Sequence, residues 1–203
     1  KKKINLKSKF FFLENLRKIV KKLNLKKNSY WEDYSEINSY NFKANENKKL
    51  IVKNFLIRKK VKSLLDLGCN DGEYTNIAYN CGISKIYSID NDGYSLNKLY
   101  NKFKNKKIEF HAIYQNFMDP SPNLGWMNNE RKSFIERFRN NFDGLICLAF
   151  IHHICIGNNV PIEDFISYLS KFSNNILLEF VPLDDPMVKN MIFNKREILK
   201  NYS

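Results

Sequence analysis

Short apolar runs alternate along the chain with longer segments in which apolar residues recur every three or four positions. Such runs are typical of buried parallel strands, and the three-to-four-residue spacing is typical of amphipathic helices. Strands that alternate with helices predict an α/β fold built on a parallel sheet. The helix predicted at 45–59 is expected to bury Leu50, Val52, Phe55 and Leu56. The predicted strands are 61–67, 85–90, 108–114, 142–150 and 175–181, and the predicted helices are 1–27, 45–59, 73–79, 94–102, 133–139, 162–172 and 187–194.

The first predicted strand runs directly into a turn that contains two glycines, Gly68 and Gly72. Glycine has no Cβ, so backbone N–H groups at such a turn can approach a ligand closely. Asp66 is expected at the carboxyl end of the strand, where open α/β sheets bind ligands. The spacing Gly68-x-x-x-Gly72 does not match the G-x-G-x-x-G pattern of pyrophosphate-binding turns. The spacing therefore gives only weak support to pyrophosphate binding at this turn.

Polar residues follow the next two predicted strands as well. Asp90 ends the second strand, 24 residues after Asp66, which is close to the interval of about 20 residues at which an acidic residue meets ribose hydroxyls. The third strand is followed by Asn116 and Phe117. Asp90 is the candidate ribose ligand, with an ordinary polar strand end as the alternative. Asn116 is also a candidate for ligand binding, with an ordinary role in forming the turn as the alternative.

The net charge of +13 is concentrated at the N-terminus. Residues 1–30 hold 11 of the 34 Lys and Arg residues and one acidic residue, Glu14, so they carry +10 and the rest of the chain carries +3. Residues 1–27 are predicted to form a basic amphipathic helix with an apolar stripe at Phe12, Leu16, Ile19 and Leu23. Two functions remain open for this stripe: contact with anionic lipid or nucleic acid, or packing on its own domain or a partner chain.

The segment that follows, 30–34, is rich in aromatic and acidic residues and either covers a cofactor cleft or forms a packed linker. The four cysteines show no C-x-x-C pair and no zinc spacing, which favours reduced thiols and a cytoplasmic location. The sequence contains no run of 18 or more apolar residues, so it predicts no membrane-spanning segment.

His152 and His153 follow the fourth predicted strand, at the carboxyl edge of the sheet where open α/β sheets bind ligands. A histidine there can act as a general base, because its pKa lies near physiological pH. His153 is the candidate for holding the site and His152 for reaching the substrate, with a hydrogen-bonded structural role as the alternative. A metal site formed with Cys155 has no support from other ligands, so none is predicted.

The turn Asp66-Leu67-Gly68-Cys69-Asn70-Asp71-Gly72 resembles motif I of the class I S-adenosylmethionine (SAM) methyltransferases, D-x-G-x-G-x-G, with Asn70 at the middle glycine. The chain also resembles a bacterial group that includes nodulation-type and surface-polysaccharide-associated methyltransferases. The segments that carry this likeness are Trp31-x-Asp33-Tyr34, Pro120-Ser121-Pro122-x-Leu124-Gly125-Trp126, Ile151-His152-His153-Ile154 and Glu179-Phe180-Val181-Pro182.

The resemblance implies a Rossmann-like, doubly wound, mostly parallel sheet that lacks the C-terminal strand pair of the family. The chain is then either truncated there or an unusually short version of the fold. It divides the chain into a helical arm with a lid segment at 1–44 and a SAM-binding domain at 45–203. It implies methyl transfer from SAM to a small-molecule or carbohydrate acceptor, on oxygen or nitrogen. The residues that it implies for cofactor binding are Asp66, Gly68, Cys69, Asn70, Gly72, Tyr74, Asp90, Asn91, Asn116, Phe117 and Leu148.

Two other functions remain as alternatives. The basic arm is compatible with an RNA-modifying methyltransferase, but the segment after the fourth strand lacks the Asn/Asp-Pro-Pro-aromatic pattern used for base amines. A non-catalytic SAM-fold module that works through its arm is the other alternative. In that case, we expect both histidines to face away from the cofactor cleft.

Overall fold

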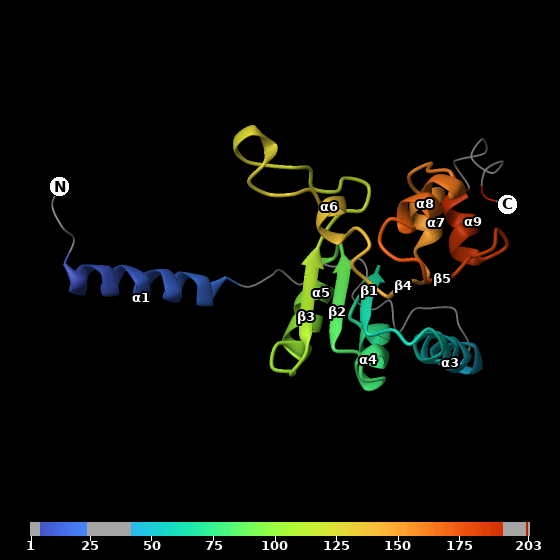
Figure 1. Ribbon diagram of the computed structural model, residues 1–203, viewed down its shortest axis with the longest axis horizontal. Coiled ribbons are helices and arrows are strands. Elements are labelled where there is room, and N and C mark those ends of the chain that lie inside the picture. The colour runs from blue at the N-terminus through green and yellow to red at the C-terminus, as the bar shows by residue number, and fades with distance from the viewer. Residues whose placement is uncertain (1–4, 24–41, 193–201, 203) are drawn as a thin grey trace.

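The computed structural model describes residues 5–23, 42–192 and 202, and a five-stranded sheet lies at its centre (Figure 1). The strand order is β3-β2-β1-β4-β5, and every pair is parallel. This confirms the predicted α/β, Rossmann-like fold. The strands are β1 (Ser63–Leu67), β2 (Lys85–Asp90), β3 (Glu109–Tyr114), β4 (Gly144–Cys147) and β5 (Ile176–Leu178).

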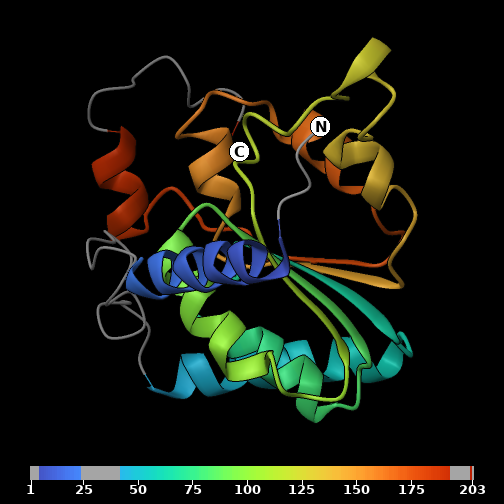
Figure 2. The same ribbon diagram turned by 90° about the vertical axis from the view of Figure 1, so that its left-hand side faces the viewer.

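Helices cover both faces of the sheet, so the fold is doubly wound. Figure 2 shows α3, α4 and α5 on one side of the strands and α6 to α9 on the other. Their bounds are α3 (Phe42–Arg58), α4 (Glu73–Asn80), α5 (Gly93–Phe103), α6 (Phe134–Phe138), α7 (Ile151–Cys155), α8 (Ile162–Leu169) and α9 (Pro186–Ile192), with a short 3₁₀ helix η1 (Trp126–Asn128) in the loop before α6.

The side chains of each strand point alternately to the two faces of the sheet, and this divides the core into two layers. In β1, Leu64 packs with Val52 and Leu56 of α3, whereas Leu65 and Leu67 pack with the aromatic residues of α6 and α8. Successive side chains of a strand point to opposite faces, so a strand buried on both sides is apolar throughout. This is why the continuous apolar runs in the sequence predict the strands well.

Two predicted features of these elements need correction. Strand β4 ends at Cys147 instead of residue 150, because Ala149 adopts a left-handed backbone conformation with φ +49° and Ile151 already begins α7. Leu50 of α3 is 54% exposed and is not part of the buried side. It lies two residues from Val52, and positions two apart do not share a helix face.

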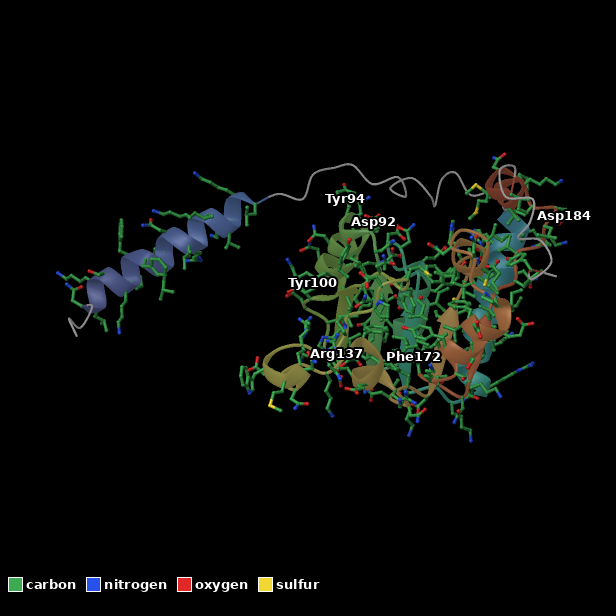
Figure 3. All side chains as sticks on the ribbon, turned by 90° about the horizontal axis from the view of Figure 1, so that it is seen from above. Asp92, Tyr94, Tyr100, Arg137, Phe172 and Asp184 are labelled. Carbon is green, nitrogen blue, oxygen red and sulfur yellow. The ribbon has the colours of Figure 1, made fainter. Side chains whose placement is uncertain are left out.

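The N-terminal helix α1 (Leu6–Lys22) buries none of its residues. Asn5 caps it by accepting a hydrogen bond from the Ser8 N–H at 2.8 Å. Figures 1 and 3 show α1 apart from the sheet, with side chains that extend from every side of the helix. Among the described residues, the apolar stripe therefore does not pack on its own domain, which is one of the alternatives that the sequence leaves open for it.

The predicted aromatic segment at 30–34 lies outside the described residues. No helix in the described part of the chain is long and apolar enough to cross a membrane.

Candidate functional site

A cavity of about 370 Å³ opens at the carboxyl ends of the strands. Strands β2 and β3 follow one another on one side of β1, and β4 lies on its other side, so the strand order reverses at β1. The cavity lies at this reversal. Ligands of open α/β sheets bind at this switch point. Its lining comes from the segments after all four of these strands and from the far end of the chain: Gly68, Asn70, Ile89, Asp90, Asn91, Asp92, Gln115, Asn116, Phe117, Met118, Leu148, Ala149, Phe150, His153, Ile154, Gly157, Asn158 and Met191.

Asp90 connects the glycine turn to the end of β2. Its carboxylate accepts a hydrogen bond from the Asn70 N–H at 2.8 Å and another from the Asp92 N–H at 3.0 Å. Asn70 can present its N–H in this way because it adopts φ +47°, a conformation that Asn tolerates well. Burial raises the pKa of Asp90 and the N–H donors oppose that rise. The result is a half-buried carboxylate that is fixed in the cavity wall.

Asp66 lies behind the turn and does not line the cavity. Its carboxylate accepts a hydrogen bond from the Thr75 hydroxyl at 2.6 Å, and this hydroxyl lies 2.7 Å from the hydroxyl of Ser88. All three side chains are buried. Burial raises the pKa of Asp66 to about 7, although the bond from Thr75 works against this. Asp66 thus joins β1, β2 and α4 behind the turn.

The segment after β3 forms another wall. Asn116 lines the cavity, and its side-chain oxygen accepts a hydrogen bond from the Met118 N–H at 2.9 Å. The Phe117 ring meets the Phe150 ring edge to face, with centroids 5.7 Å apart. Apolar rings beside amide groups suit a flat heteroaromatic ligand.

The segment after β4 is held by a buried charge. Ala149 donates its N–H to Glu179 at 2.6 Å, and Glu179 pairs with Lys48 of α3, also at 2.6 Å. Both charged side chains are mostly buried. Lys48 holds Glu179, and Glu179 holds the backbone N–H of the left-handed Ala149. This sets the positions of the neighbouring Leu148 and Phe150 in the cavity wall.

The two histidines differ in position. His153 lines the cavity, and burial together with the adjacent His152 lowers its pKa to about 4. His152 is only 3% exposed and is absent from the lining, and its Nδ1 has no hydrogen-bond partner among the described residues. Within the described ranges, no three His, Cys, Asp or Glu side chains gather in a way that could hold a metal ion.

Eight of the thirteen predicted site residues line the cavity: Gly68, Asn70, Asp90, Asn91, Asn116, Phe117, Leu148 and His153. The other five do not: Asp66, Cys69, Gly72, Tyr74 and His152. These five support the turn or the core instead. Cys69 belongs to an apolar cluster with Leu96 and Leu99, Tyr74 packs beside the α3–β1 core, and a Cβ on Gly72 would meet Leu99.

Several lining residues escape sequence reasoning. Asp92 accepts hydrogen bonds from the Tyr94 N–H and the Ser95 hydroxyl, so it caps α5 as well as lining the cavity, and Figure 3 shows it beside Tyr94. Ala149 carries no sequence signal of its left-handed conformation. The Gly157-Asn158 pair, by contrast, is typical of a turn. In the structure, the side-chain amide of Asn158 donates to the His153 carbonyl at 2.8 Å.

A parallel sheet in this order, with a glycine turn after β1 and a cavity at the switch point, defines the fold of the class I SAM-dependent methyltransferases. Solved structures of WbdD share this fold. Monomeric WbdD matches with a TM-score of 0.54 at 18% identity, over 91% of this chain and 43% of WbdD. The bifunctional kinase-methyltransferase WbdD matches with a TM-score of 0.53 at 18% identity, over 84% of this chain and 36% of WbdD.

The chain is similar in sequence to the nodulation protein NoeA of Rhizobium meliloti (strain 1021), with 30% identity over 182 residues. The match covers 90% of this chain and 38% of NoeA, so the chain spans less than half the length of this relative. No family model matches the chain. The resemblance to class I methyltransferases near these groups, inferred from the sequence, is confirmed.

Proposed function

We propose that this chain binds SAM in the cavity and transfers its methyl group to oxygen or nitrogen of a small-molecule or carbohydrate acceptor. The observation that carries the proposal is Asp90. Each carboxylate oxygen accepts one backbone N–H and keeps further acceptor capacity for a hydroxyl donor. A fixed carboxylate in a cavity wall suits a ribose diol and repels a phosphate.

The residues present fit this cofactor. A Cβ on Gly68 would come within 2.8 Å of the Phe150 ring, so the turn lies as close to the cavity wall as a glycine permits. The wall also offers amides from Asn91 and Asn116 and an aromatic edge from Phe117. Ribose, adenine and amino-acid groups together require this mixture of carboxylate, amide and apolar surface.

When bound, SAM supplies an electrophilic methyl on its sulfonium sulfur; the acceptor atom bonds to it as the carbon–sulfur bond breaks, and the acceptor releases its proton. The protein contributes mainly alignment to a displacement of this kind. The sequence favours His152 for reaching the acceptor, but His153 lines the cavity and His152 does not, so we assign the role of receiving the proton to His153. Burial and the adjacent His152 lower its pKa to about 4, so the imidazole is neutral at neutral pH but is a weaker base than an ordinary histidine.

Calorimetric titration of the full chain with S-adenosylhomocysteine tests the binding step. We expect binding by the wild type, its loss in Asp90→Ala and its retention in Asp164→Ala, since Asp164 is an exposed residue of α8 outside the cavity. If the wild type binds neither SAM nor S-adenosylhomocysteine, the proposal is refuted. Equal binding by the two variants would remove Asp90 as the ribose ligand.

Transfer of labelled methyl from SAM to a panel of small molecules and oligosaccharides tests the chemistry. We expect His153→Gln to bind S-adenosylhomocysteine like the wild type and to lower kcat by roughly 10² or more, the usual contribution of a general base. Unchanged kcat would make His153 structural. A wild type that binds the cofactor but methylates no acceptor would favour the non-catalytic module.

A further inference from the structure

The helix α1 presents an unusual surface. All nine of its large apolar side chains between Leu6 and Leu23 are exposed. Apolar patches of more than a few hundred Å² are rare on monomeric soluble proteins and mark surfaces that contact something else. At about 100° per residue, most of these side chains fall on one side of the helix. That apolar face consists of Leu6, Phe10, Phe12, Leu13, Leu16, Ile19, Val20 and Leu23.

The opposite side of α1 is basic. The helix contains six Lys and Arg residues and one acid, Glu14, so it carries +5. Glu14 pairs with Arg17 at 3.3 Å. The basic face consists of Lys7, Lys18, Lys21 and Lys22, with Ser8 and Asn15 beside them. A helix with a broad apolar face, a cationic opposite face and aromatic residues has the features of helices that lie in the membrane interface.

We propose that α1 docks this protein on the surface of an anionic lipid bilayer, with the apolar face in the headgroup–acyl boundary and the basic face against anionic headgroups. The charge of α1 complements such a surface, to which each Lys or Arg adds attraction. The proposal is independent of cofactor binding.

The position of Lys9 favours lipid over a second copy of the helix. Lys9 lies three, four and seven residues before Phe12, Leu13 and Leu16, so it sits within the apolar face. At a bilayer, its long side chain can reach the headgroup phosphates while its methylenes stay in apolar surroundings. In a seam between two copies of α1 it would be buried, and the sole acid of the helix, Glu14, lies on the other face and pairs with Arg17.

Nucleic acid is also a weaker fit. An RNA-binding helix uses cationic groups and stacked aromatic rings. RNA contact on the basic face would leave Leu13, Leu16, Ile19 and Val20 in water. Lipid accounts for both faces at once.

Sedimentation of the full chain with vesicles of phosphatidylcholine, alone or mixed with phosphatidylglycerol, tests the proposal. Phe12→Ser and Phe11→Ser form a matched pair, because these adjacent rings are 62% and 69% exposed but Phe11 lies on the basic face. We expect Phe12→Ser to weaken binding to the mixed vesicles by roughly tenfold, as expected for one phenyl ring withdrawn from the interface. Phe11→Ser should change it much less.

A charge variant tests the proposed contact between the basic face and anionic headgroups. Lys18→Gln should weaken binding to the mixed vesicles by roughly fivefold and leave binding to phosphatidylcholine alone almost unchanged. Added salt should weaken binding to the mixed vesicles. Circular dichroism of each variant without vesicles checks that the fold is intact.

Four outcomes overturn the proposal. The first is no vesicle binding by the wild type, and the second is equal effects of Phe11→Ser and Phe12→Ser on vesicle binding. The third is binding of a labelled single-stranded RNA that falls in Lys18→Gln but not in Phe12→Ser, without vesicle binding, which assigns the arm to nucleic acid. The fourth is a dimer in sedimentation velocity that Phe12→Ser abolishes, again without vesicle binding.

Discussion

Substitution of Gly68 tests whether the contact between the glycine turn and the Phe150 ring shapes the binding site. Gly68 adopts φ +70°, and a Cβ built on it would lie 2.8 Å from Cδ2 of Phe150. Gly82, in the turn after α4, adopts φ +83°, but apart from its chain neighbours no described residue has an atom within 4 Å of its Cβ position. Gly68→Ala and Gly82→Ala therefore impose the same kind of backbone strain, and only the first pushes on the cavity wall.

The expected magnitudes follow from these two environments. An L-residue in the left-handed region costs about 1–2 kcal/mol, so Gly82→Ala should lower the free energy of unfolding by about that amount. At Gly68 the same cost is joined by displacement of the Phe150 ring, which packs at 5.7 Å from Phe117. Overpacking of a fitted site adds about 1–3 kcal/mol. Gly68→Ala should thus be the less stable variant by at least about 1 kcal/mol.

Urea denaturation measures the stabilities, and calorimetry with S-adenosylhomocysteine measures the effect on the site. We expect Gly68→Ala to bind at least about tenfold more weakly, which corresponds to about 1.4 kcal/mol, and Gly82→Ala to bind like the wild type. If both variants lose equal stability and retain wild-type affinity, the contact between the turn and Phe150 does not shape the binding site.

Two further predictions concern buried acids. Asp66→Asn should abolish a pH dependence of the free energy of unfolding. Burial raises the pKa of Asp66 from 3.8 to about 7, so between these values the native state binds a proton that the unfolded state does not. Wild-type stability therefore falls as pH rises from about 4 to 7, by at most about 1.4 kcal/mol per pH unit. Denaturation at stepped pH measures this, and an identical slope in Asp66→Asn would disprove it. Glu179→Gln should lower stability by about 2 kcal/mol, because it removes the negative charge that pairs with the mostly buried Lys48. The exposed Glu163→Gln should change stability little. Equal melting curves for the two variants would show that the pair contributes nothing.

The sequence predicts the sheet well because its central strands, β1 and β4, are buried on both faces and are therefore apolar almost throughout. A strand such as β2 (Lys85–Asp90) has the same bounds in the sequence prediction and in the structure. The errors fall where tertiary contacts decide the backbone. The predicted fourth strand extends to residue 150 because apolar residues continue that far, yet Glu179 holds the Ala149 N–H and turns the chain after Cys147.

The candidate site was predictable in part for a similar reason. Residues at or just after the end of a strand, such as Gly68, Asp90 and Asn116, line the cavity because the carboxyl ends of parallel strands meet at one edge. A local motif does not indicate which of its side chains point into the cavity. Met191 lies in α9, far along the chain, and only the packing of this helix brings it to the cavity wall.

The two acids at neighbouring strand ends differ in the donors available to them. Asp90 accepts two backbone N–H groups beside the cavity, whereas Asp66 is fully enclosed and accepts the hydroxyl of Thr75. The charge of Asp90 adds to the rise in the pKa of Asp66, which reaches about 7. A protonated Asp66 removes one like charge from the vicinity of Asp90 and favours the ionised form of Asp90 at the cavity wall. One acid can thus support the turn while the other presents a charge to a ligand, a division of roles that the spacing Asp66…Asp90 in the sequence does not reveal.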